Sequence, residues 1–175
     1  LPAPAIEAKL REEWGASPER ARLLGRLCAG SLGWAVSFLR EEKLLEPRAQ
    51  RLEMLKRALG EGLEGRFSLA AELAMRLGRQ RELAPEWFDT WLSWWRDLLV
   101  IKGGTPDAIV NVDEEAILAE QARACSLREI VAVIDSLQAA KESIDSNVNI
   151  RLMLETLMLD LPISKGRKEE KEALV

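Results

Sequence analysis

Apolar residues recur at helical spacing along almost the whole chain, and the pattern is strongest between Glu82 and Lys102. In this stretch the apolar positions follow i, i+4, i+7 and i+8 spacing: Trp87, Trp91, Trp94, Trp95, Leu98 and Ile101. At ~100° per residue these side chains share one face of a helix. Tryptophan is enriched both in protein cores and at subunit contacts, so this face packs either inside the chain or against a neighbour. Packing in the core is the simpler interpretation.

Capping signals predict further helices in the first half of the chain. Ser17 precedes a proline and is expected to cap one helix, and Ser31 is expected to cap the next. Pro47 is expected to open a fourth helix, because proline is favoured in the first turn. After a connector at residues 62–67, Ser68 is expected to cap a fifth helix.

The second half of the chain shows a loop followed by three more helix starts. Residues 103–112, which include two glycines and a proline, form the longest predicted loop. Asp113 is expected to cap the helix that follows. Ser126 and Glu129 have the spacing of a capping box, in which each side chain bonds the other's backbone amide. Asn149 is expected to cap the last helix.

The last predicted helix is stopped by Pro162 and is apolar on most sides, so it should lie centrally in the core. Its expected buried face consists of Leu152, Leu154, Leu157, Met158 and Leu161. Together these patterns predict an all-α protein that divides at the Glu46–Pro47 junction. Three short helices precede that junction, and a bundle of five or six helices follows it, over residues 47–163. Residues 164–175 are highly charged and are predicted to form a disordered tail.

Composition excludes several classes of function. The chain has 175 residues, a formal net charge of −4, and neither histidine nor tyrosine. Catalytic triads, Cys-His nucleophiles, histidine-ligated zinc and tyrosine acid–base chemistry are therefore unavailable. The acidic balance argues against direct nucleic-acid binding, which needs a basic face. The two cysteines, Cys28 and Cys125, both lie in apolar helical patterns, which indicates buried thiols.

The sequence also bears on location. No apolar run approaches the ~20 residues that span a bilayer. The first residues lack the basic and apolar regions of a secretory signal. We therefore expect a cytoplasmic protein that does not contact membranes, and the start at Leu1 rather than methionine indicates a piece of a longer chain.

The most specific short motif is Gly30-Ser31-Leu32-Gly33. Gly30 and Ser31 are explained as the end of one helix and the cap of the next. Gly33 is not, because glycine in a helix costs ~1 kcal/mol relative to alanine. Glycine there would allow close approach by a ligand or by another backbone. A phosphate-binding loop of the Gly-x-x-x-x-Gly-Lys-Ser/Thr type is absent, so no nucleotide cofactor is predicted.

The remaining polar candidates have ordinary structural explanations. Arg96 and Asp97 lie within the tryptophan-rich helix, and they are expected to form either an internal ion pair or an interface contact. The acidic run 113–115 fits the first turn of a helix, where the helix dipole favours acids, so no metal site is predicted. Asn147 fits a turn and Asn149 a cap.

The order of three motifs resembles the clamp-loader subunits of bacterial DNA polymerase III, and among them the delta-prime subunits. The first motif is Gly30-Ser31-Leu32-Gly33, the second is Trp91 with Trp94-Trp95-Arg96-Asp97, and the third is Asn147-Val148-Asn149 with Arg151, Leu152, Leu154, Glu155 and Leu157. The resemblance covers residues 5–162. It implies an AAA+ lid at residues 1–46 and a helical collar at residues 47–163.

The resemblance also implies a role in assembly rather than catalysis. The collar would bind the delta and tau/gamma subunits, and the sliding clamp and primed DNA would be reached only through the full assembly. Gly30, Ser31 and Gly33 would face the nucleotide at the sensor 2 position, where the motor subunits carry an arginine that Gly33 cannot replace. Trp91, Trp94, Trp95, Arg96, Asp97, Asn147, Asn149, Arg151 and Glu155 would be structural or interface residues.

Three alternatives stay open. The chain could be the collar of a tau/gamma motor subunit, although Gly33 argues against it. It could be a helical enzyme domain, but no pair of carboxylates stands out on an apolar helix face. It could also be a helical adaptor unrelated to replication, which would not need the three motifs in this order.

Overall fold

The computed structural model describes residues 1–144, 146 and 148–162, and within them it contains helices and no strand, which confirms the all-α prediction. The α-helices are α1 (Ala3–Trp14), α2 (Pro18–Leu27), α3 (Leu32–Arg40), α4 (Glu46–Gly60), α5 (Leu63–Arg79), α6 (Ala84–Lys102), α7 (Glu115–Ala124), α8 (Leu127–Ser143) and α9 (Ile150–Asp160). Short 3-10 helices connect some of them: η1 (Glu42–Leu45), η2 (Arg81–Leu83), η3 (Pro106–Ala108) and η4 (Val112–Glu114). The predicted tail, residues 164–175, lies outside the described residues.

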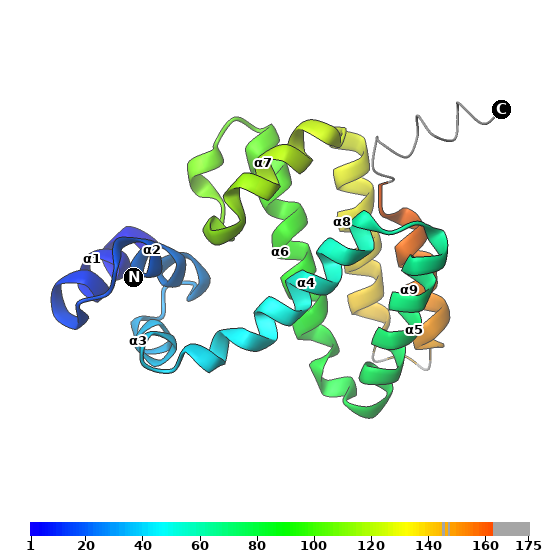
Figure 1. Cartoon of the computed structure of the whole chain (residues 1–175), viewed down its shortest axis with the longest axis horizontal. Coiled ribbons are helices and arrows are strands. Elements are labelled where there is room, and N and C mark those ends of the chain that lie inside the picture. Colours follow the sequence, from blue (N-terminus) through cyan, green and yellow to red (C-terminus); the bar gives the residue numbers. More distant parts are fainter. Residues whose placement is uncertain (145, 147, 163–175) are drawn as a thin grey trace.

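Buried apolar side chains form two clusters. The smaller cluster joins α1, α2 and α3, and the larger one joins α4–α9. Figure 1 shows the first three helices gathered at one end of the molecule, with α4 leading from them into the bundle. Leu45 packs on the first cluster and Leu52 belongs to the second, so the predicted boundary at residues 46 and 47 falls between them. The assignment of these clusters as separate domains stays a prediction.

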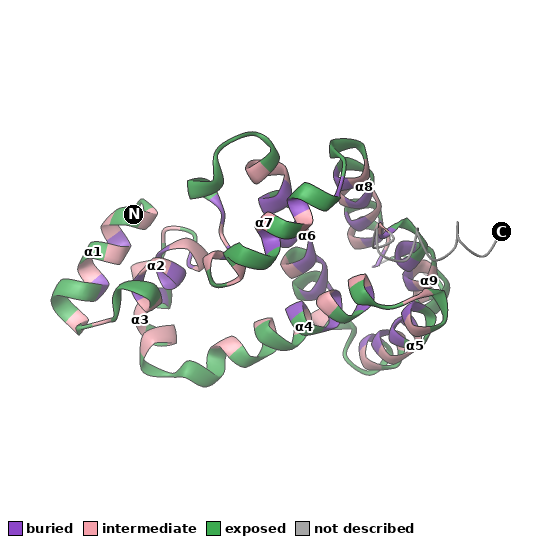
Figure 2. Cartoon of the chain, turned by 45° about the horizontal axis from the view of Figure 1, so that its top comes forward, coloured by how far each residue is buried: buried purple, intermediate pink, exposed green. Residues whose placement is uncertain are grey.

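The long helix α6 is the centre of the larger cluster. Helix α6 packs against α8, α7 and α4. Helices α5 and α9 pack against each other, and α9 also packs against α8. Figure 2 shows buried positions on α6 facing its neighbours. The wide apolar face of this helix explains its position, because only burial on several sides removes so much apolar surface from water.

Four helix starts predicted from capping residues are confirmed. The Ser17 hydroxyl accepts from the Arg20 amide at 3.3 Å, and the Ser31 hydroxyl accepts from the Trp34 amide at 3.5 Å. Ser126 and Glu129 form the predicted capping box. The Asn149 side chain accepts from the Leu152 amide at 3.2 Å. Each cap satisfies an amide that the helix itself cannot pair.

Two predicted helix starts are wrong. Helix α5 begins at Leu63 after the extended residue Gly62, so Ser68 lies inside the helix and residues 63–67 belong to it rather than to a connector. Asp113 lies in η4 and caps no helix, because its carboxylate is bound by the guanidinium of Arg48 at 2.7 Å. Helix α2 also ends at Leu27, three residues before Gly30.

The last helix is only partly as expected. Leu154, Leu157 and Met158 are buried, but Leu152 is 61% exposed. The prediction that Leu152 belongs to the core is therefore wrong, because α9 is covered by α5 and α8 and its remaining side faces solvent. Among the described residues, no helix is both long enough and apolar enough to span a bilayer.

Candidate functional site

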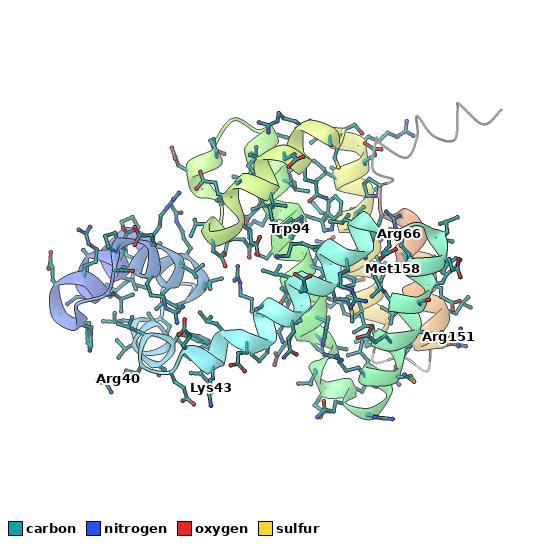
Figure 3. The ribbon with its side chains drawn as sticks, viewed as in Figure 1. Arg40, Lys43, Arg66, Trp94, Arg151 and Met158 are labelled. Atoms are coloured by element: carbon teal, nitrogen blue, oxygen red, sulfur yellow. The ribbon has the colours of Figure 1, made fainter. Side chains whose placement is uncertain are left out.

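The tryptophans of α6 lie in the interior of the larger cluster. Trp91 is 1% exposed, and Trp94 and Trp95 are 0% exposed. The Trp91 indole N–H donates to the Arg51 carbonyl of α4 at 2.9 Å, and the Trp94 indole N–H donates to Gln121 of α7 at 2.7 Å. Figure 3 places Trp94 between α6 and α7. These side chains fix α4 and α7 on α6, and their burial leaves them out of reach of a neighbouring subunit.

Trp95 differs from Trp91 and Trp94 in that its indole N–H, which is buried, forms no hydrogen bond among the described residues. An unpaired buried donor costs free energy, so the apolar bulk of this ring must outweigh that penalty. We find that Trp95 contributes through packing alone.

Arg96 and Asp97 differ in their surroundings, and neither forms an ion pair among the described residues. The contact with a neighbouring subunit that was the alternative expectation stays a prediction. Asp97 is buried and points into the fold, while Arg96 is exposed and forms no hydrogen bond or ion pair among the described residues. The Asp97 carboxylate accepts from the Val110 amide at 2.9 Å and from the Asn111 amide at 2.8 Å. It also accepts from the Asn111 side chain at 2.8 Å. Asp97 therefore fastens the loop after α6 back onto the helix.

The hydrogen bonds of Asp97 continue into α4. The Asn111 side-chain oxygen accepts from the Arg48 guanidinium at 2.7 Å, and Asp113 pairs with the same guanidinium. No signal in the sequence indicated Arg48 and Asn111, because these two residues bond to each other across 63 positions of the chain. The result is a polar network that holds the loop, α4 and α6 together.

The acidic run after the loop is divided among three cations. Asp113 pairs with Arg48, Glu114 with Lys56 at 3.0 Å, and Glu115 with Arg22 at 3.2 Å. Burial lowers the pKa of Lys56, but hydrogen bonding and charge from Glu114 and Glu53 outweigh it and leave that pKa raised. Within the described part of the chain, no three histidine, cysteine or acidic side chains gather as a possible metal site.

The same segment connects the two clusters. The Arg22 guanidinium of α2 reaches Glu115, and that of Arg26 donates to the Asp107 carbonyl at 2.6 Å. These contacts are exposed and polar. The first three helices are therefore positioned on the bundle through residues 107–115 as well as through α4.

Arg66 is a structural residue that sequence reasoning missed. It is 2% exposed, and its guanidinium donates to four carbonyls: Ala58 at 2.9 Å, Met158 at 3.2 Å, Leu161 at 2.7 Å and Pro162 at 2.7 Å. Figure 3 labels Arg66 and Met158 where α4, α5 and α9 meet. The last carbonyls of a helix lack internal partners, and a cation there also complements the helix dipole. Arg66 thus terminates α9 in place of a capping residue.

The Gly30-Ser31-Leu32-Gly33 motif forms the turn between α2 and α3. Gly30 adopts the left-handed conformation with φ of 91°, and its carbonyl accepts from the backbone nitrogen of Leu1 at 2.8 Å. Gly33 is exposed in the first turn of α3, and a side chain added there would meet no atom within 4 Å. Among the described residues, no other backbone makes the close approach that Gly33 could have allowed.

The residues of the third motif lie on α9 and just before it. Asn149 caps the helix, and Arg151 pairs with Glu155 at 2.8 Å across one turn. This ion pair is exposed, with the Arg151 side chain 65% accessible, so its contribution to stability is small. Asn147 lies outside the described residues. The structure separates this motif from the glycine motif, which belongs to the other cluster.

Comparisons with known proteins agree with the resemblance seen in the sequence. The family described as DNA polymerase III, delta subunit, C terminal, matches residues 42–162. The DNA polymerase III subunit delta' of Bacillus subtilis (strain 168) is 26% identical over 157 residues, which cover 90% of this chain and 47% of that relative. The chain thus spans about half the length of the curated relative that it matches. No solved structure matches.

The matched residues begin in η1, include all of α4–α9 and end at Pro162, so they contain the whole larger cluster. Two of the three motifs that carried the resemblance, on the tryptophan-rich helix and at the capped last helix, lie within the match, and the glycine motif at residues 30–33 precedes it. The chain belongs to the family of C-terminal regions of the DNA polymerase III delta subunit, with a delta'-like sequence.

Proposed function

We propose that this chain supplies the lid and the collar of a delta-prime-like clamp-loader subunit and works by assembly rather than catalysis. Residues 1–46 form the lid and residues 47–163 the collar. The collar binds the delta and tau/gamma subunits in the cytoplasm, without a cofactor and without contacting a membrane. The sliding clamp and primed DNA are reached only through the full assembly.

The observation that carries this proposal is the agreement between the family match and the packing. The match covers residues 42–162, and the larger apolar cluster runs from Leu52 to Leu161. The family match thus describes one packed helical bundle rather than scattered motifs. A rigid bundle centred on α6 suits a part that keeps subunits in register, because its helices are held by buried tryptophans and a polar network.

The charges support assembly over catalysis. The acidic residues 113–115 are each bound to a different cation, so they do not converge on a common site. Gly33 faces open space and supplies no charge that could reach a nucleotide phosphate. This feature favours a delta-prime-like subunit over a tau/gamma motor.

Light scattering on a sizing column tests the proposal. The chain is mixed with the delta and tau/gamma subunits of the same organism, and the mass of each peak is measured. We expect a discrete complex that contains the chain. Excess delta-prime subunit of that organism should displace it, whereas excess tau/gamma should not. A chain that elutes at its own mass beside both partners would contradict the assembly role.

A second measurement tests the absence of catalysis. ATP hydrolysis by the complex should be unchanged when Gly33→Arg replaces the wild-type chain, because the parent subunit is proposed to act as a non-hydrolysing component. A large rise in turnover with this variant would favour the motor alternative.

A further inference from the structure

Helices α8 and α9 run antiparallel and leave an open groove between them. The Ser136 hydroxyl donates to the Asp160 carboxylate at 2.7 Å near one end of the pair. The Ser143 hydroxyl contacts the Met153 sulfur at 3.5 Å near the other end. Between these contacts lies a groove with a volume of about 540 Å³. It follows most of α9, whose 11 residues extend over ~16 Å.

The groove is lined by small side chains on the α8 side and by larger apolar side chains on the α9 side. On α8 it is lined by small side chains, Ser136, Ala139, Ala140 and Ser143. On the α9 side Val148 and Leu152 line it, and they are 37% and 61% exposed. Leucine and valine left in water beside a row of small residues form a surface that another helix could approach closely.

The margins of the groove are acidic. Asp160 lines the groove on α9. Asp135 and Glu142 are exposed on α8 and flank Ala139 at i−4 and i+3, so the three residues form one row on the helix surface. Within the described residues none of these carboxylates has an ion-pair partner.

The neighbouring cations do not neutralise these carboxylates. Lys141 on α8 is bound to Asp89 of α6, and Arg151 on α9 is bound to Glu155. Arg128 lies about two helical turns before Ser136 on α8. Ser136 is already level with Asp160, the last residue of α9, so Arg128 lies past the end of the groove. An apolar floor with unpaired acidic margins repels nucleic acids and anionic membranes and attracts a basic partner.

We propose that the α8–α9 groove is the docking site for a basic amphipathic helix of another clamp-loader subunit. Small or medium apolar residues of that helix pack on Ala139 and Leu152. Lysine or arginine residues on its flanks meet Asp135, Glu142 and Asp160. The proposal rests on the assembly role stated above and names the surface that performs it.

Substitutions at two leucines that are both more than half exposed test the site. Leu152→Glu places a charge in the groove, and Leu127→Glu places one on α8 outside it, at a leucine that is 54% exposed. Both variants should melt like the wild type, because neither leucine is buried. In the complex with the delta and tau/gamma subunits, Leu152→Glu should raise Kd roughly tenfold or more, as for a central interface residue. Leu127→Glu should leave Kd within about twofold.

The acidic margins are tested by charge reversal. The double variant Asp135→Lys/Glu142→Lys should weaken the same complex and reduce the dependence of Kd on salt, because attraction between exposed charges is screened by ions. A complex that binds more tightly after this reversal would show that the partner surface is acidic, and that result would overturn the proposal.

The outcomes separate the groove from the assembly role. If the wild-type complex forms and Leu152→Glu binds as tightly as the wild type, the groove is not the docking site, while the assembly role stands. If the wild-type chain forms no complex, the assembly role fails and the groove proposal fails with it. Loss of binding by Leu127→Glu to the same extent as Leu152→Glu would also overturn the assignment to this groove.

Discussion

Replacing Asp97 should loosen the bundle far more than replacing its neighbour Arg96. Asp97 is 1% exposed and accepts three N–H hydrogen bonds, from the Val110 amide and from the amide and side chain of Asn111. Arg96 is exposed and makes no such contacts among the described residues. The two substitutions therefore compare a buried anchor with a solvent-facing charge at adjacent positions of one helix.

The magnitude follows from the hydrogen bonds that are lost. A bond to a charged group contributes ~1.5–3 kcal/mol, and a buried donor left without a partner costs ~1–3 kcal/mol. Asn111 is 1% exposed, so its backbone amide would be left buried without a partner, while its side-chain NH2 would keep only the bond to the Ser93 hydroxyl. The Val110 amide is less buried and can bond to water instead. We expect Asp97→Ala to lower the free energy of unfolding by ~3–5 kcal/mol.

Asp97→Asn separates the charge from the shape of this side chain. The amide oxygen of the new asparagine can accept from the backbone N–H of either Val110 or Asn111. Its NH2 group would then face the other backbone N–H, so two donors would meet. We expect a loss of ~1.5–3 kcal/mol for Asp97→Asn, and a change within ~0.5 kcal/mol for Arg96→Ala.

Urea unfolding followed by tryptophan fluorescence and circular dichroism measures these differences. Amide hydrogen exchange at Val110 and Asn111 should quicken in both Asp97 variants, because the loop loses its attachment to α6. If Asp97→Asn and Arg96→Ala unfold at the same urea concentration as the wild type, the inward carboxylate does not hold the loop and the reasoning is refuted.

Three further changes have defined outcomes. Trp95→Ala should cost ~3–5 kcal/mol of stability because the ring is fully buried, whereas Trp34→Ala, at a ring that is 67% exposed, should shift the melting temperature little. Gly33→Ala should stabilise the chain by ~0.5–1 kcal/mol, since a methyl group meets open space in a helix; a lower melting temperature would contradict this. Burial raises the pKa of the Cys28 thiol from 9.0 to about 11. Its contribution to stability should therefore be complete below about pH 9 and decline as pH rises through about 11, which pH-dependent urea unfolding can check against Cys28→Ala.

The helix starts show which parts of the fold were predictable from the sequence. The caps at Ser17, Ser31, Ser126 and Asn149 were predictable because each partner amide lies three residues away. Such a bond depends on local sequence alone, and no distant residue is needed to form it. The order and type of the helices could therefore be predicted.

The errors occurred where a distant partner decides the outcome. Asp113 has the character of a cap, but Arg48 binds its carboxylate from 65 residues away. Ser68 has the same character, but helix α5 starts earlier and carries Arg66, which binds carbonyls at the end of α9. An arginine in a predicted connector gives no signal that it will be buried. Its role depends on a helix end 95 residues further along the chain.

The choice between core and interface for the tryptophan face could not be settled by periodicity either. Both settings select a wide apolar face, so the same pattern predicts each of them. Packing resolves the choice, because α4, α7 and α8 pack against α6 and its tryptophans are at most 4% exposed. The most apolar face of the chain is buried by its own helices, so a partner can bind only apolar surface that stays exposed. That surface includes Leu152 on α9, a residue that the sequence pattern assigned to the core. Its exposure in the α8–α9 groove, beside carboxylates without ion-pair partners among the described residues, makes this groove the strongest candidate for an assembly surface.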